Sequence, residues 1–230
     1  MTELIKEKNA FVRPSPTRLQ LGGVAAHTVE TILVCEAAGF DRIIIETVGV
    51  GQSETLASQL ADAVLLLLVS GTGDELQGVK KGILESADFV LVNKADGDNE
   101  KPAKIYAAEL DGISTLWPLR RNGEKAFVMS GSTIENASMG FLFDQIEKFK
   151  MKVEINGEFK KNRQNQKIDW MKALVLQRMV GLMSQKMGLK ALIEKGEHEV
   201  RNGNGLVSLE VSKMMDEIQS KILSSVKIRQ

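Results

Sequence analysis

The stretch F-V-L-V-N-K-A-D at residues 89–96 decides the fold, because four apolar residues run without interruption into a polar loop. Two similar runs precede it, R-I-I-I at 42–45 and A-V-L-L-L-L-V at 63–69, and A-F-V-M follows at 126–129. Continuous rather than alternating apolar character is typical of strands that are buried on both faces of a parallel sheet. Helical patterns separate these runs, so the sequence predicts βαβ units and an α/β fold.

The residue pattern of the sequence changes after residue 150. Strand-like runs largely stop, and apolar residues recur near helical spacing in 170–182 and 211–222. N-G-N-G at 202–205 predicts a turn between two helices. We therefore expect an α/β domain over residues 1–150 and a helical C-terminal arm over 151–230.

The composition excludes several classes of function. The 230 residues include 30 Lys+Arg and 30 Asp+Glu, which removes the electrostatic reason to expect nucleic-acid or anionic-membrane binding. One cysteine and two histidines leave no internal disulfide and no Cys/His metal cluster. No apolar run approaches the roughly 20 residues of a membrane span, and the first ten residues lack the apolar core of a signal peptide. These features predict a soluble, cytoplasmic protein.

The loop after the strand at 89–92 carries the first chemical motif. Asn93, Lys94 and Asp96 fit the N-K-x-D guanine-specificity motif of GTP-binding proteins. A carboxylate can accept hydrogen bonds from both N1–H and the exocyclic amine of guanine, a pairing that adenine cannot offer. The Lys94 stem can lie over the base, and the Asn93 amide can tie the loop together. The alternative is an ordinary loop in which Asp96 caps the following helix.

A second small loop ends the next expected strand. Ser130, Gly131 and Ser132 stand where GTPases place backbone N–H groups that contact the guanine O6. S-G-S alone is common in turns, but its order and distance after the first motif favour a second part of the same base site.

E-T-V-G-V-G-Q-S-E at 46–54 follows the first strand run. An acid at the end of a strand, with glycine three residues on, is the D-x-x-G arrangement with Glu46 in place of Asp. Glu46 would hold Mg²⁺ and the Gly49 N–H would meet a γ-phosphate, with Gln52 as a further catalytic candidate. Val50 occupies the position at which small GTPases carry their water-orienting glutamine, so Gln52 cannot simply inherit that role. A glycine-rich turn is an equal alternative.

Three strings together resemble the MeaB/ArgK family, the methylmalonyl-CoA mutase-associated GTPases: the string at 46–54, G-D-E-L-Q-G-V-K-K-G at 73–82, and N-K-A-D. F-V-R-P-S-P at 11–16, L-G-G-V at 21–24 and I-D-W at 168–170 also resemble segments of that family. The resemblance implies a mostly parallel P-loop GTPase-type sheet with a C-terminal helical extension. It also implies GTP/GDP and Mg²⁺ as cofactors.

The same resemblance implies a function. The family's role is that of a GTP-hydrolysing chaperone that gates cofactor loading and protects an adenosylcobalamin-dependent mutase. The partner would be methylmalonyl-CoA mutase or a related B12-dependent acyl-CoA mutase, and the helical arm would mediate homodimerisation. Residues 73–82 match the family's mobile coupling loop, which makes coupling candidates of Asp74, Glu75, Gln77 and Lys80. For Lys80, a solvated helix start is an equal alternative.

The phosphate half of a GTP site is missing from the sequence. No G-x-x-x-x-G-K-[ST] occurs, and family members carry that loop and its strand upstream of the point where this chain begins. We favour an N-terminally truncated GTPase, because Glu46 and Gly49 stand intact without another evident use. The alternative is a P-loop-less pseudo-GTPase that acts as a non-catalytic interaction module. Without the P-loop strand, we expect either poor stability or direct pairing of the strands at 42–45 and 63–69.

Overall fold

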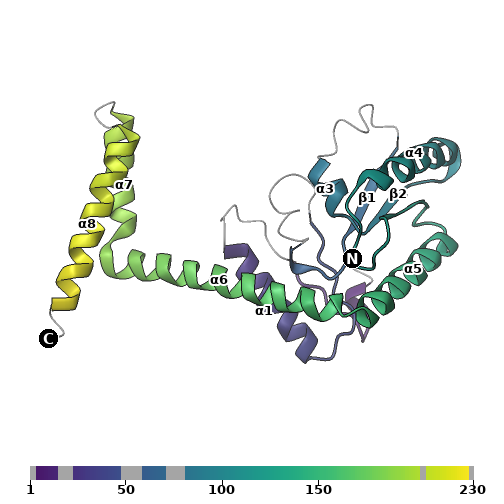
Figure 1. The fold of residues 1–230 in the computed structure, drawn as a ribbon, viewed down its shortest axis with the longest axis horizontal. Coiled ribbons are helices and arrows are strands. Elements are labelled where there is room, and N and C mark those ends of the chain that lie inside the picture. Colours follow the sequence, from purple (N-terminus) through teal and green to yellow (C-terminus); the bar gives the residue numbers. More distant parts are fainter. Residues whose placement is uncertain (1–3, 15–22, 48–58, 71–80, 203–205, 228–230) are drawn as a thin grey trace. The chain divides into compact units, whose positions relative to one another are not determined.

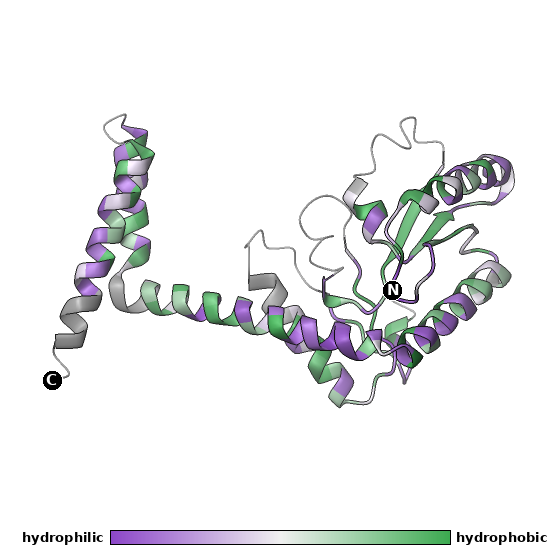
Figure 2. Cartoon of the chain, viewed as in Figure 1, coloured by the Kyte–Doolittle hydropathy of each residue, from purple (hydrophilic) through white to green (hydrophobic). Residues whose placement is uncertain are grey.

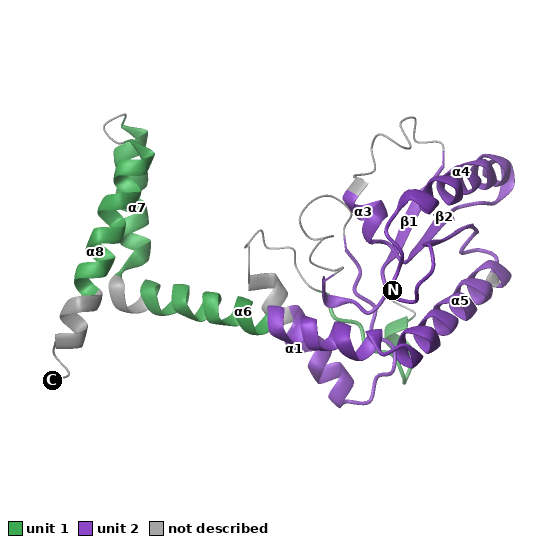
Figure 3. Ribbon diagram, in the orientation of Figure 1, with its two compact units in different colours: residues 1–27, 170–230 green, residues 28–169 purple. Residues whose placement is uncertain are grey.

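The computed structural model describes residues 4–14, 23–47, 59–70, 81–202 and 206–227 (Figure 1). The chain forms two compact units: Thr28–Asp169, and Met1–His27 together with Trp170–Gln230 (Figure 3). The expected division at residue 150 stays a prediction.

A parallel three-stranded sheet forms the centre of the unit Thr28–Asp169. Its strands are β1 (Leu65–Val69), β2 (Phe89–Asn93) and β3 (Phe127–Ser130), in the order β1-β2-β3. In register, Leu67 of β1 lies opposite Leu91 of β2. Figure 2 shows β1 and β2 as hydrophobic along their length. β2 is covered on both faces, whereas Leu65 and Leu67 of β1 are exposed. The α/β fold and the strands expected near 63–69, 89–92 and 126–129 are confirmed.

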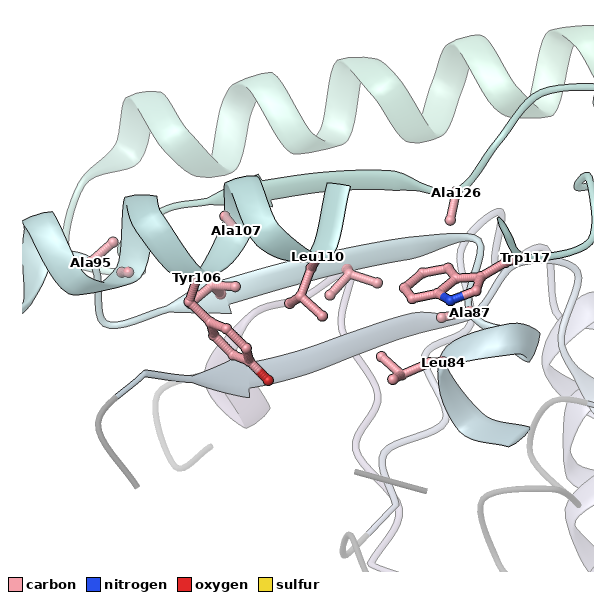
Figure 4. Packing of buried hydrophobic residues seen from close by; sticks show 11 residues of the cluster. Leu84, Ala87, Ala95, Tyr106, Ala107, Leu110, Trp117 and Ala126 are labelled. Atoms are coloured by element: carbon pink, nitrogen blue, oxygen red, sulfur yellow. The ribbon is translucent and has the colours of Figure 1, made fainter. Parts of the chain in front are cut away.

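One face of the sheet packs against α4 (Glu100–Ile113). Val90 and Val92 of β2 are fully buried on this face, together with Leu110 of α4. Trp117 closes the end of the cluster beyond the helix (Figure 4). The cluster is completed by small and apolar side chains, namely Leu84, Ala87, Ala95, Ala103, Tyr106, Ala107 and Ala126. This layer holds the end of β2 and the loop that follows it in place.

The opposite face of the sheet packs against α5 (Asn136–Ile155). Phe89 and Leu91 of β2 point to this side, since neighbouring residues of a strand alternate between faces. The ring of Phe89 meets that of Phe149 edge to face, with centroids 5.5 Å apart. Both faces of β2 are therefore covered.

The unit boundaries fall within α1 (Gly23–Ala37) and α6 (Glu158–Met187). Within residues 28–169 the two helices are joined by charge to the segment before β1, since Arg163 Nη2 lies 2.7 Å from both Glu36 Oε1 and Asp62 Oδ2. In the other unit α7 (Leu189–Arg201) packs against α8 (Val207–Lys227), as expected for a C-terminal helical extension. The short elements are η1 (Leu4–Lys6), α3 (Lys81–Ser86), η2 (Gly97–Asn99) and η3 (Ser114–Leu116).

The strand expected at residues 42–45 is wrong, since this segment has no regular secondary structure. Ile44 is 85% exposed, and the segment does not pair with β1. A strand needs a hydrogen-bonding neighbour; within the described residues β1 pairs with β2 alone, and Leu67 on β1 is 57% exposed. The expectation that 42–45 would close directly on β1 is therefore also wrong.

No helix in the described ranges is both long and apolar enough to cross a membrane.

Candidate functional site

The loop after β2 lies at the carboxyl end of the sheet, where ligands bind in open α/β folds. Lys94 has a φ of 58°, in the left-handed region, and is the one described non-glycine residue with a positive φ. This conformation turns the chain sharply from the strand into η2 and α4. Asp96 occupies the position before η2, but its side chain makes no capping hydrogen bond. The structure therefore does not use Asp96 as the helix cap that the alternative interpretation required.

The loop after β3 lies directly beside the first loop. The backbone N–H of Gly131 donates to the Val92 carbonyl at 3.0 Å, and the N–H of Ala95 donates to the Gly131 carbonyl at 3.1 Å. The Ser132 hydroxyl donates to Asp96 Oδ2 at 2.5 Å. These bonds join two loops that are 36 residues apart in the sequence. The structure thus brings together the six residues that the two motifs contribute: Asn93, Lys94, Asp96, Ser130, Gly131 and Ser132.

Close packing explains the glycine in the second loop. A Cβ at Gly131 would lie 3.0 Å from Ser138 Cβ and 3.3 Å from Leu91 Cδ1. Because contacts this short force neighbouring atoms to move, a larger residue would displace the loop from the first motif. The absence of a side chain at Gly131 therefore lets the second loop lie close to Leu91 and Ser138.

Three groups at this edge can recognise a polar ligand. Among the described residues, the Asp96 carboxylate accepts one hydrogen bond, from Ser132, although a carboxylate can accept about four. Asn93 Oδ1 is buried and has no partner within the described ranges. Because buried polar atoms are normally bonded, this oxygen is a candidate acceptor for a hydrogen bond from a ligand. The Lys94 side chain is exposed beside them.

Two residues that the sequence did not single out support the first loop. Ser70, which directly follows β1 and is 6% exposed, donates its hydroxyl hydrogen to Asn99 Oδ1 at 2.7 Å. Asn99 Nδ2 in turn donates to the Lys94 carbonyl at 2.7 Å. No motif signals this contact, because it joins positions 29 residues apart through a strand pairing.

The other predicted site residues are not brought to this edge by any described contact. Glu46 is exposed in the irregular segment before residue 48. Gly49 and Gln52 lie outside the described residues, as do the coupling candidates Asp74, Glu75, Gln77 and Lys80. Within the described ranges, no group of three or more His, Cys, Asp or Glu side chains could hold a metal ion. The catalytic, metal-binding and coupling roles of these residues stay predictions.

The geometry can be compared with known proteins. A family model described as "Methylmalonyl Co-A mutase-associated GTPase MeaB" matches residues 1–188. A probable GTPase of Mycobacterium bovis is 38% identical over 216 residues, which cover 94% of this chain and 64% of that protein. GTPase ArgK of Escherichia coli is 38% identical over 174 residues, covering 75% of this chain and 52% of that protein.

A mammalian relative and a solved structure extend the comparison. The mouse protein named "Methylmalonic aciduria type A homolog, mitochondrial" is 38% identical over 205 residues, which cover 88% of this chain and 49% of that protein. A crystal structure titled "LAO/AO transport system kinase" superposes with a TM-score of 0.70 at 27% identity, covering 94% of this chain and 68% of that one. The chain thus spans about half to two thirds of the length of these curated relatives.

Proposed function

Because the chain belongs to the MeaB family of methylmalonyl-CoA mutase-associated GTPases, we propose that its β2 and β3 loops form the guanine-recognition part of a GTP-binding, GTP-hydrolysing protein. The observation that carries this proposal is the pairing of the two loops through Asp96 and Ser132. It leaves the rest of the Asp96 carboxylate available to accept hydrogen bonds from a base.

The chemistry of the base follows from the donor pattern. Guanine presents N1–H and an exocyclic amine side by side, and one carboxylate can accept from both. Adenine presents an acceptor at N1 and would meet the negative carboxylate with a lone pair. Asp96 would therefore select guanine over adenine, while Ser132 fixes the direction in which the carboxylate faces.

Mg²⁺ belongs to the same proposal, because it is usually held by one or two carboxylates together with substrate phosphates. Glu46 is an exposed carboxylate that could supply one such oxygen. The metal would neutralise phosphate charge during transfer. The residues of the β2 and β3 loops, by contrast, would act on the base.

The experiment is a calorimetric or NMR titration of the chain with GDP, IDP, XDP and ADP, continued to millimolar ligand. We expect binding to follow GDP > IDP > ADP, because IDP lacks the exocyclic amine. Asp96→Asn should lower the GDP affinity roughly 10- to 100-fold, the effect of losing a hydrogen bond to a charged group, and should improve XDP binding. Asp98→Asn is the matched control, since Asp98 is an exposed carboxylate two residues away. Equal affinity for GDP and ADP, or an unchanged Asp96→Asn variant, would refute the proposal.

The partner is the second part of the proposal: a chaperone role toward methylmalonyl-CoA mutase or a related adenosylcobalamin-dependent mutase. It is supported by the family description. The test is co-elution of the chain with purified mutase, with and without GDP. If the chain fails to co-elute with the mutase both with and without GDP, a direct partnership for this part of the protein is contradicted.

Homodimerisation through the helical arm is proposed with it. It is supported by apolar side chains on α6 that are about half exposed at helical spacing, which include Met171, Val175 and Met179. Exposed apolar stripes of this kind mark association surfaces. Light scattering should report a dimer that Val175→Lys with Met179→Lys converts to a monomer, whereas Gln177→Lys, an exposed polar position on the same helix, should remain dimeric. A monomeric wild-type chain would overturn this part.

A further inference from the structure

We propose that Ser70 and Asn99 are positioning residues for guanine recognition, which hold the Lys94–Asp96 loop in its binding conformation from the neighbouring strand. This inference rests on the proposed guanine site, because it names residues that act on that site without touching the base. The two side chains form a bridge from the end of β1 to the loop after β2.

The loop needs such a support. Lys94 adopts a left-handed backbone conformation. This conformation is unfavourable for residues other than glycine and persists where surrounding contacts hold it. Asn99 supplies two of those contacts: its side-chain Nδ2 donates to the Lys94 carbonyl at 2.7 Å, and its backbone N–H donates to the Asp96 carbonyl at 3.1 Å. Both residues that Asn99 holds belong to the N-K-x-D motif.

Ser70 supports the orientation that the Asn99 amide needs. The Lys94 carbonyl can only accept, so it requires the NH₂ end of the amide. The amide oxygen then faces Ser70, whose hydroxyl donates to it. Because Ser70 is nearly fully buried at the end of a strand, it is a fixed anchor. Ser70 thus acts on Lys94 through Asn99 rather than directly.

Four variants test the bridge. Asn99→Ala should lower the GDP affinity roughly 3- to 10-fold, the usual effect of losing a neutral hydrogen bond, and should speed amide exchange of residues 94–98 in the nucleotide-free chain. Asn99→Asp should behave like Asn99→Ala, because it keeps the acceptor for Ser70 but loses the donor to Lys94. Ser70→Ala should give a smaller change in the same direction. In the double variant Ser70→Ala should add nothing, because its effect passes through Asn99.

Asn122→Ala is the matched control, an asparagine in a turn whose amide bonds to Glu124. Asp96→Ala separates the two proposals. If Asp96→Ala loses GDP but the Asn99 and Ser70 variants bind like wild type with unchanged loop exchange, the positioning role is wrong and the guanine site stands. If Asp96→Ala binds GDP normally, the guanine site is wrong.

Amide exchange of residues 94–98 in the nucleotide-free chain tests the bridge without reference to nucleotide binding. Faster exchange in Asn99→Ala supports the bridge, and unchanged exchange overturns it. Additive effects of Ser70→Ala and Asn99→Ala would also overturn it. If Asn99→Ala fails to fold, Asn99→Asp and Ser70→Ala carry the same comparison.

Discussion

Gly131→Ala is the substitution that most directly tests how the two loops are held together. The added Cβ would lie 3.0 Å from Ser138 Cβ, 3.3 Å from Leu91 Cδ1 and 3.4 Å from Met129 Cε. Leu91 is 1% exposed, and Ser138 lies on the α5 backbone. Neither can move far without disturbing the packing of the sheet against α5.

The expected cost is that of overpacking a close-packed site, about 1–3 kcal/mol of unfolding free energy. For a chain of this size each kcal/mol changes the melting temperature by about 2–4 °C, so the variant should melt roughly 2–12 °C lower. Displacement of Ser132 from Asp96 should weaken GDP binding in parallel. Both quantities can be measured, by urea unfolding followed by circular dichroism and by nucleotide titration.

A control and a rescue make the test specific. Gly140→Ala lies on α5 where a Cβ meets nothing within 4 Å, and should raise stability by about 0.5–1 kcal/mol. Ser138→Gly removes the nearest atom, so Gly131→Ala combined with Ser138→Gly should be more stable than the sum of the two single changes predicts. If Gly131→Ala unfolds at the wild-type urea concentration, or if Ser138→Gly gives no recovery, the steric argument is wrong.

Three further perturbations follow from the packing and charges. Leu110→Ala should lower the unfolding free energy by about 2–5 kcal/mol, since Leu110 is fully buried under the sheet; a loss below 1 kcal/mol in urea unfolding would contradict this. Burial raises the pKa of Asp88, so protonation favours the folded state and this contribution is lost as the pH rises through the folded-state pKa. The stability of wild type relative to Asp88→Asn should therefore fall as the pH rises above the ordinary aspartate pKa of 3.8; a rise would contradict it. Arg163→Ala should cost about 1–3 kcal/mol, because Glu36 and Asp62 share its guanidinium; Arg163→Lys should recover part of that loss, and equal losses in both variants would argue against the shared contact.

The sequence was sufficient for the parts of the fold that depend on local patterns. Continuous apolar runs identified β1, β2 and β3, because such runs are typical of the strands of a parallel sheet in an α/β fold. The helical C-terminal arm followed from apolar spacing in the same way. The run at 42–45 shows the limit of that reasoning, since apolar character makes a strand possible but a pairing partner is needed to form one.

The two loops of the proposed base site were also visible in the sequence as N-K-A-D and S-G-S. Their residue types identify the chemistry, since a carboxylate that can accept two hydrogen bonds suits guanine. That Asp96 does not cap the following helix, and that Ser132 bonds to it instead, became clear from the three-dimensional arrangement. Loop residues compete for several local hydrogen bonds, and the choice among them depends on what packs beside them.

The sequence by itself determined the fold class, the family and the residue types of the proposed base site, because all three are encoded in local runs and short motifs. The tertiary structure alone decided the contacts that depend on strands pairing at a distance. The bridge from Ser70 through Asn99 to Lys94 exists because β1 pairs with β2 in a register that places Leu68 opposite Val92. Gly131 meets Leu91 because β3 lies on the other side of the same strand. No local pattern encodes these contacts, since each arises from hydrogen-bonded register between segments far apart in the chain.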